Sequence, residues 1–193
     1  TSAEGVAVSS YNTMDSHSSS TINLENVFVT EANLIVDEGE GFRHIESCLP
    51  QILLCLSAEA LGIMEVLNKL TVEYSKTRKQ FGAPIGSFQA LQHRMVDNFM
   101  AFEQSKSMVY RGICESTSFN KNDIDINQFL KTAHAVKALI AKNSKQIGDE
   151  SIQIHGGIGM TDELNIGHFV KRLMMINVLF GDGDFHRQCF SQN

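Results

Sequence analysis

Apolar residues recur at every third or fourth position along most of the chain after Cys48. The first stripe comprises Leu49, Ile52, Leu53, Leu56, Ala60, Ile63, Leu67, Leu70 and Tyr74. This spacing places the side chains on one face of a helix. Pro50, near its start, indicates either a first-turn position or a kink.

Two further long stripes and a shorter one follow. The second comprises Phe88, Leu91, Met95, Phe99 and Phe102, after Ser87 as a candidate N-cap. The third comprises Ile126, Phe129, Leu130, Ala133, Val136, Ile140, Ile147 and Ile154, and ends at Gly156 and Gly157. Residues 165–180 form the short amphipathic stretch. Three long helices and a shorter fourth, joined by short loops, predict an antiparallel bundle.

Before residue 38 the apolar residues no longer follow the three-to-four-residue spacing of a helix. Residues 4–8, 20–29 and 32–36 are short, β-branched and bounded by Ser, Asn and Asp, which is typical of strands. Ile22, Leu24 and Val27 nearly alternate with polar residues, as in a half-buried strand. The acidic, Gly-rich break at 37–42 indicates a boundary. We therefore predict a mainly α chain: residues 1–38 as the end of a β domain, whose earlier part we expect to be missing, and residues 39–193 as the helical bundle.

Composition narrows the class of protein. The chain has 193 residues, 42% of them apolar and 20% charged, and a net charge of -6. These values indicate a globular protein, and without clustered Lys and Arg nucleic acid is not an expected partner. We predict no membrane span and no metal site. The four cysteines lack metal or redox spacing, so we expect buried free thiols in a reducing compartment.

Residues 77–95, "TRKQFGAPIGSFQALQHRM", gather basic and ring side chains around one loop. One interpretation is a solvated helix end, where basic residues complement the helix dipole. The other is an anion site, in which Arg78 pairs with a phosphate, Phe81 packs on a flat ring and Gln89 hydrogen-bonds a ligand edge. His93 and Arg94 belong to the same cluster.

Residues 153–164, "QIHGGIGMTDEL", place three glycines after the third stripe. Gly156 and Gly157 are expected to end the helix, because glycine adopts positive φ at little cost. Their missing side chains would also let a phosphate or planar ligand approach the backbone. The segment is not a G-x-G-x-x-G motif after a strand, so it predicts no Rossmann site.

Two carboxylates remain open to alternatives. Asp182 lies in "GDGDFHR", where its pairing with a histidine could support proton transfer, although His186 is more typical of a structural histidine. Glu59 lies beside the first stripe, and either it faces solvent at the stripe's edge or it needs a partner in the core.

Taken together, three stretches resemble the acyl-CoA dehydrogenase family. They are residues 58–97 with their R-x-x-F-G loop, the Q-x-x-G-G-x-G segment at 153–159, and residues 168–187, which resemble the family's catalytic loop. The resemblance implies the C-terminal four-helix bundle of an FAD-binding enzyme that assembles as a dimer of dimers. The family's N-terminal helical domain and most of its β domain, which supply flavin-ring contacts, are then expected to be absent from this chain. It also implies α,β-desaturation of an acyl-CoA thioester and electron transfer to an electron-transfer flavoprotein.

The resemblance assigns roles to individual positions. Arg78, Phe81 and Gln89 would contact the adenosine-diphosphate part of an FAD that is held mainly by a neighbouring subunit. Gln153, Gly156 and Gly157 would lie against its pyrophosphate and adenine end, so the cofactor would bridge two chains. The family's glutamate base falls on Gly181, and the minority position on the first bundle helix falls near Ile52. Neither residue accepts a proton.

Three interpretations of the missing base stay open: Asp182 takes the role, the base comes from elsewhere, or the chain is a non-catalytic subunit that completes the FAD site of a paralogous partner. Residues 179–186, with the pattern "LFGD…H", and residues 58–67, "AEALGIMEVL", resemble small-subunit-type bacterial members. We expect the chain alone to be inactive and to hold FAD weakly. Bacterial cytoplasm is the expected location, with an organelle matrix as the alternative.

Overall fold

The computed structural model describes residues 3–121 and 123–192. The chain divides into two compact units between Cys48 and Leu49. The boundary predicted after residue 38 lies earlier, in the loop that precedes the first long helix.

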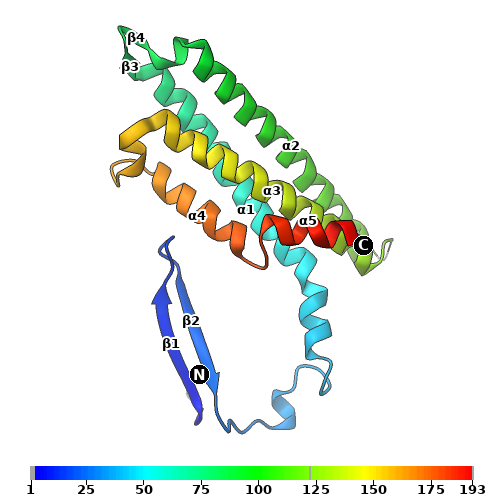
Figure 1. Cartoon of the computed structure of the whole chain (residues 1–193). Helices are drawn as coiled ribbons and strands as arrows, with labels where there is room; N and C mark the ends of the chain where they lie inside the picture. Colours follow the sequence, from blue (N-terminus) through cyan, green and yellow to red (C-terminus); the bar gives the residue numbers. More distant parts are fainter. Residues whose placement is uncertain (1–2, 122, 193) are drawn as a thin grey trace. The chain divides into compact units, whose positions relative to one another are not determined.

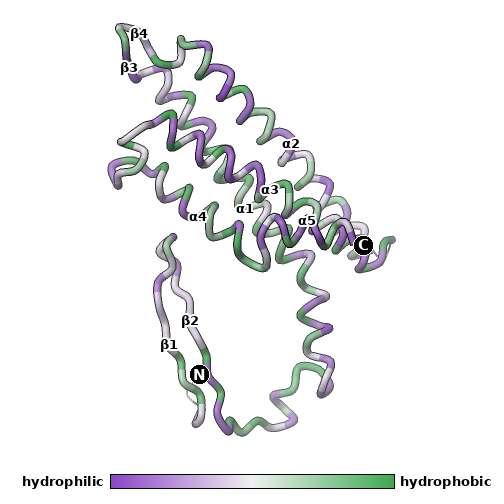
Figure 2. Tube along the Cα trace, viewed as in Figure 1, coloured by the Kyte–Doolittle hydropathy of each residue, from purple (hydrophilic) through white to green (hydrophobic). Residues whose placement is uncertain are grey.

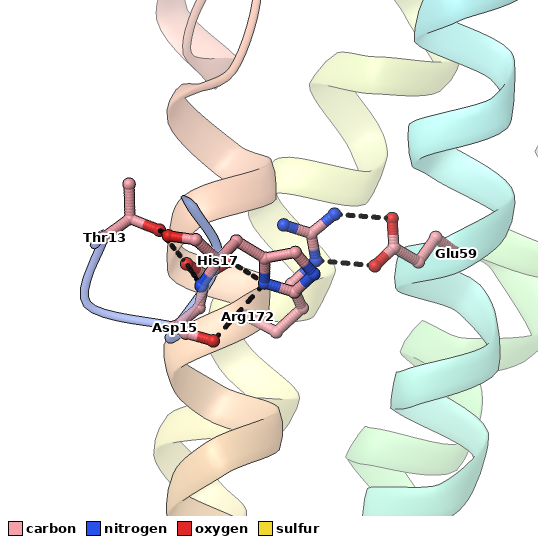
Figure 3. A network of polar contacts seen from close by, with 5 residues as sticks. All are labelled: Thr13, Asp15, His17, Glu59 and Arg172. Atoms are coloured by element: carbon pink, nitrogen blue, oxygen red, sulfur yellow. Dashed lines mark hydrogen bonds and ion pairs between the residues drawn. The ribbon is translucent and has the colours of Figure 1, made fainter. Parts of the chain in front are cut away.

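The first unit contains one antiparallel hairpin, β1 (Val6–Asn12) and β2 (Ser18–Leu24), with Val6 opposite Leu24 and Asn12 opposite Ser18. The hairpin turn is closed by Thr13, whose backbone N–H and hydroxyl both donate to the carbonyl of His17, at 2.8 and 3.0 Å. Figure 3 shows Thr13, Asp15 and His17 gathered in this turn.

Two expectations for this unit are wrong. Residues 32–36 form no strand; η1 (Glu31–Asn33) is a 3₁₀ turn in which Asn33 N–H donates to Thr30 O and Thr30 Oγ1 donates to Asn33 Oδ1. These local hydrogen bonds compete with strand pairing. Ile22 and Leu24 are 55% and 70% exposed, so the alternating pattern is not half-buried here. Within the described residues of this unit, β2 pairs only with β1, and no second layer covers its apolar side chains.

The second unit is the helical bundle, which confirms the predicted fold class. Helices α1 (Gly41–Thr77), α2 (Gln89–Asn120), α3 (Ile126–His155) and α4 (Ile166–Val178) lie side by side, and a fifth, α5 (Gly183–Gln192), packs on α3 (Figure 1). Between α1 and α2, β3 (Lys79–Gln80) and β4 (Ala83–Pro84) form a small hairpin, followed by η2 (Ile85–Ser87). After α3 comes η3 (Gly156–Met160).

The core lies between the helices, where the apolar faces meet (Figure 2). Its fully buried members include Met64, Leu67, Phe129, Val136, Ile140, Ile147 and Ile176. Helix α1 is long and apolar enough to cross a membrane by length and composition alone. Since Leu53, Ala60, Met64 and Leu67 are fully buried in the bundle, we interpret α1 as a core helix.

Three local expectations are corrected. Pro50 lies inside α1, so it is not a first-turn residue. Phe88, not Ser87, is the N-cap of α2, because the Ser87 hydroxyl donates to Pro84 O at 2.6 Å. Cys48, Cys55 and Cys114 are exposed, so the expectation of buried thiols is wrong for these three, and Cys189 is partly buried. The three exposed thiols belong to helix positions that lie outside the buried stripes.

Candidate functional site

One end of the bundle brings together the two segments that the sequence singled out. Tyr74, in the last turn of α1, stacks on His155 at the end of α3, with ring centroids 4.3 Å apart. Its hydroxyl donates to the His155 carbonyl at 3.3 Å. Because Arg78 follows Tyr74 by one turn and Gly156 follows His155 directly, the loop and the glycine turn lie at the same end of one chain (Figure 1).

The loop after α1 presents its side chains outward. Phe81 and Gly82 connect β3 to β4 with φ of 54° and 80°, the pattern of a two-residue turn in which both central residues are left-handed. Phe81 is 94% exposed, and its ring lies edge-on to that of Phe88, with ring centroids 6.2 Å apart. Positive φ is costly for a bulky residue, so an exposed ring held this way is a candidate contact for a ligand.

Two polar side chains beside this loop are unpaired. Arg78 and Gln89 are exposed, and neither side chain has a hydrogen-bond or ion-pair partner among the residues that the structure describes. A guanidinium with no counter-ion next to an exposed aromatic ring is suited to an anionic ligand that carries a flat ring.

The glycine turn is open. Gly156 caps α3 with φ 66°, donates its N–H to Ile152 O and ends the helix as the sequence predicts. A Cβ added to Gly156 or Gly157 would meet nothing within 4 Å. Gly157 therefore has no steric need to be glycine within its own fold, and the exposed Gln153 lies one turn before it. The residues fit a cofactor whose phosphates approach bare backbone.

Arg94 does not join this cluster. Its Nε lies 2.5 Å from Oε2 of Glu150, and its Nη2 donates to Oε1 at 2.9 Å. This bidentate pair ties α2 to α3, so the guanidinium is already neutralised. The basic cluster expected from the sequence therefore loses one of its charges.

The position that the resemblance gives to the catalytic base is closed. Gly181 has φ 110°, and a Cβ added there would overlap Cδ1 of Phe185 and lie 3.2 Å from Nε2 of His186. No side chain fits at residue 181 unless Phe185 moves. Asp182 next to it caps α5, because its Oδ1 accepts from the Phe185 N–H at 2.8 Å. The catalytic role of Asp182 stays a prediction.

Behind this loop lies a buried polar cluster that sequence reasoning missed. His134, Lys137 and His186 are 4%, 0% and 0% exposed, and the two histidine Nδ1 atoms lie 2.8 Å apart. Burial, together with the neighbouring His134 and Lys137, lowers the pKa of His186 to about 4. Burial likewise lowers the pKa of Lys137 to about 8, although Asp182 partly opposes it. The available signal was that Lys137 falls on the apolar stripe of α3, between Ala133 and Ile140.

Glu59 is paired. Arg172 on α4 donates to both of its carboxylate oxygens, Nε to Oε1 at 2.5 Å and Nη2 to Oε2 at 2.8 Å (Figure 3). The Glu59 side chain is 41% exposed, so it lies at the edge of the stripe as one of the two interpretations held. The pair joins α1 to α4.

The chain is a helical bundle that exposes an unpaired arginine, an aromatic ring and open glycine backbone at one end. The family model for the acyl-CoA dehydrogenase C-terminal domain matches residues 39–193. The chain belongs to the acyl-CoA dehydrogenase family.

Relatives agree with this assignment. The chain is 30% identical over 163 residues to a mitochondrial 2-methylacyl-CoA dehydrogenase of Solanum tuberosum, covering 84% of this chain and 38% of that one. It is 40% identical over 119 residues to the acyl-CoA dehydrogenase IpdE2 of Mycolicibacterium smegmatis, covering 62% and 34%. The solved structure of PigA with FAD and proline matches with a TM-score of 0.86 and 26% identity, over 99% of this chain and 49% of that one. The chain thus spans less than half the length of these relatives.

Proposed function

We propose that this bundle is the C-terminal part of an FAD-dependent acyl-CoA dehydrogenase that desaturates an acyl-CoA thioester between its α and β carbons. Membership of the family and the FAD bound by PigA support the cofactor. The observation that carries the proposal is that the exposed Arg78 and Phe81 and the open backbone at Gly156 and Gly157 lie at the same end of the bundle, joined by the Tyr74–His155 contact. FAD, when bound, supplies the hydride acceptor for the β carbon.

The residues of this chain would bind and orient the cofactor. Arg78 would pair with a phosphate, and Phe81 would pack against a flat ring. Gln89 and Gln153 would hydrogen-bond ligand edges. The bare backbone at Gly156 and Gly157 would let the pyrophosphate approach. Asp182 is the carboxylate of this chain proposed to take the α proton, and it is held in place by its cap on α5.

Partners and location belong to the same proposal. An electron-transfer flavoprotein is the proposed acceptor of the electrons, and a dimer of dimers is the proposed assembly. A reducing compartment, either bacterial cytoplasm or an organelle matrix, is supported by the exposed thiols of Cys48, Cys55 and Cys114, because exposed thiols persist where disulfides are kept reduced.

The test uses the protein expressed from its complete gene. Flavin absorbance after gel filtration is compared for the wild type, Arg78→Met and the control Arg111→Met, an exposed arginine at the other end of α2. We expect flavin in the wild type and the control, and loss from Arg78→Met. A wild type that holds no flavin, alone or with a co-expressed paralogue, would refute the proposal.

A second function is favoured by the closed loop at Gly181. Because a Cβ at residue 181 would overlap the Phe185 ring, we propose as the alternative that the chain is a non-catalytic subunit that completes the FAD site of an active paralogue. Co-expression with that paralogue separates the two functions. Asp182→Asn abolishes turnover of the complex if this chain supplies the base, and leaves turnover intact if the paralogue supplies it.

A further inference from the structure

The ammonium group of one buried lysine donates hydrogen bonds to backbone carbonyls at the end of α4 and in the loop between α4 and α5. Lys137 projects from the middle of α3, and its side chain is fully buried. Its Nζ donates to the carbonyl of Ile176 at 2.7 Å and to those of Asn177 and Gly181 at 3.4 Å each. One charged group therefore connects the last turn of α4 to Gly181.

The carbonyls at this place need a donor. The last four carbonyls of a helix have no partner inside it, and the helix end carries a partial negative charge. An ammonium offers three N–H donors and a positive charge, so Lys137 matches both needs at the end of α4. Leu or Met would fill a similar volume without the cost of burying a charge.

Two neutral contacts bring the same loop to α3 but stop short of Gly181. Ser144 Oγ donates to Asn177 Oδ1 at 3.0 Å. Gly183 approaches Ala141 so closely that an added Cβ would lie 2.9 Å from the Ala141 Cβ. Lys137 donates to the Gly181 carbonyl at 3.4 Å, and the Gly181 backbone also interacts with the His186 ring, which raises the pKa of that histidine against the effect of burial.

We propose that Lys137 is a positioning residue, a buried cation that fixes Gly181 and the adjoining Asp182 where this loop takes part in the reaction of the assembled enzyme. The link to the reaction rests on the proposed function. The fixing of the loop does not, because it follows from the three carbonyl contacts alone.

Amide hydrogen exchange tests the fixing of the loop. In the protein from its complete gene, with its partner if it has one, Lys137→Met should speed exchange at residues 179–183 about tenfold or more, the size expected for losing a charge-assisted hydrogen bond. Exchange at residues 126–133, in the first turns of α3, should change by less than about twofold. Lys137→Arg keeps the charge and the donors and should restore part of the protection.

Lys142→Met is the matched control, an exposed lysine on the same helix, and it should leave both segments unchanged. Equal protection of residues 179–183 in Lys137→Met and wild type would overturn the proposal. If Lys137→Met does not fold, Lys137→Arg and Lys137→Gln supply the same comparison.

Steady-state kinetics test the positioning role. Misplacing a reacting group lowers kcat more than it raises KM, so Lys137→Met should lower kcat about tenfold or more with KM within about threefold. A loosened loop with unchanged kcat would show that Lys137 is structural only and would also overturn the proposal. Absence of turnover in the wild-type assembly would instead refute the proposed function, and the exchange comparison would still decide whether Lys137 holds the loop.

Discussion

Phe81 and Gly82 join β3 to β4, and Phe180 and Gly181 join α4 to α5. In both pairs each residue has positive φ, 54° and 80° in the first and 58° and 110° in the second. Around Gly82 a Cβ would meet nothing, whereas at Gly181 it would overlap Phe185. The same pair of positive φ angles thus occurs in two loops that differ in space. The β3–β4 loop has room for a side chain at Gly82, whereas the loop at the position of the family's base has none at Gly181. Motif and dihedral angles alone do not distinguish the two; the neighbouring side chains do.

The largest expected effect comes from adding one methyl group to each loop. Gly181→Ala combines a left-handed alanine, about 1–2 kcal/mol, with overpacking against Phe185, about 1–3 kcal/mol. Gly82→Ala carries only the first cost. Urea unfolding of the protein from its complete gene should therefore show a free energy of unfolding lower by about 2–5 kcal/mol in Gly181→Ala and by about 1–2 kcal/mol in Gly82→Ala.

A second variant assigns the cause. Gly181→Ala with Phe185→Ala should destabilise by less than the sum of the two single variants, because removing the ring makes room for the methyl group. If the destabilisation by the two substitutions were strictly additive, the Phe185 ring would not limit the space at residue 181. Gly157→Ala, with open space and no positive φ, is the control and should stay within about 0.5 kcal/mol.

Acid should destabilise the closed region first. The folded-state pKa of His186 is about 4, below its ordinary value, so the unfolded chain binds more protons between about pH 6.5 and pH 4. Stability is fully present above that window and is lost as pH falls through it, by roughly 2–4 kcal/mol. Burial also lowers the pKa of His134, which acts in the same direction.

The measurement is the free energy of unfolding at several pH values between 4 and 7. His186→Gln should flatten the dependence, because Gln keeps hydrogen-bonding capacity toward His134 but does not titrate. Identical slopes in wild type and His186→Gln would be evidence that the buried pair does not control acid stability.

The three long helices and the glycine turn after α3 were more predictable from the sequence than the loop at Gly181 and helix α5. The stripes through α1, α2 and α3 predicted their helices because local periodicity decides which face is buried, and Gly156 ends α3 where the sequence placed the stop. Helix α5 was not predicted, because Gly181, Asp182 and Gly183 look like a loop. It is held by packing on α3, through contacts such as that of His186 with His134.

Pairings between distant residues were beyond the sequence. Lys137 and Gly181 are far apart in the chain, and only the packed bundle shows that the ammonium meets that carbonyl. The same holds for Arg94, which looked like a free cation until its pairing with Glu150 was seen. Periodicity indicates which face is buried, not which partner it meets.

At the open loop, Arg78→Met is expected to weaken cofactor binding. A charge-assisted contact to a phosphate contributes about 1.5–3 kcal/mol, so the dissociation constant for FAD should rise about 10–100-fold. Thermal stability of the flavin-free protein should not change, because Arg78 has no side-chain partner among the described residues. Flavin titration of the deflavinated protein gives the constant, and an unchanged value would mean that the loop faces solvent.

The smallest expected effect is a gain of stability, and it is the sharpest probe of why Phe81 is present. A two-residue turn with both φ values positive favours Asn followed by Gly, so Phe81→Asn should stabilise the flavin-free protein by about 0.5–1 kcal/mol. The same change removes the ring proposed to pack on the cofactor and should weaken FAD binding several-fold. Opposite signs in the two measurements are the expected outcome, because a strained, exposed aromatic residue is worth its cost only when a ligand covers it. If Phe81→Asn bound flavin as tightly as the wild type, cofactor binding would not explain the positive φ of Phe81. The β3–β4 loop would then have no functional difference from the loop at Gly181.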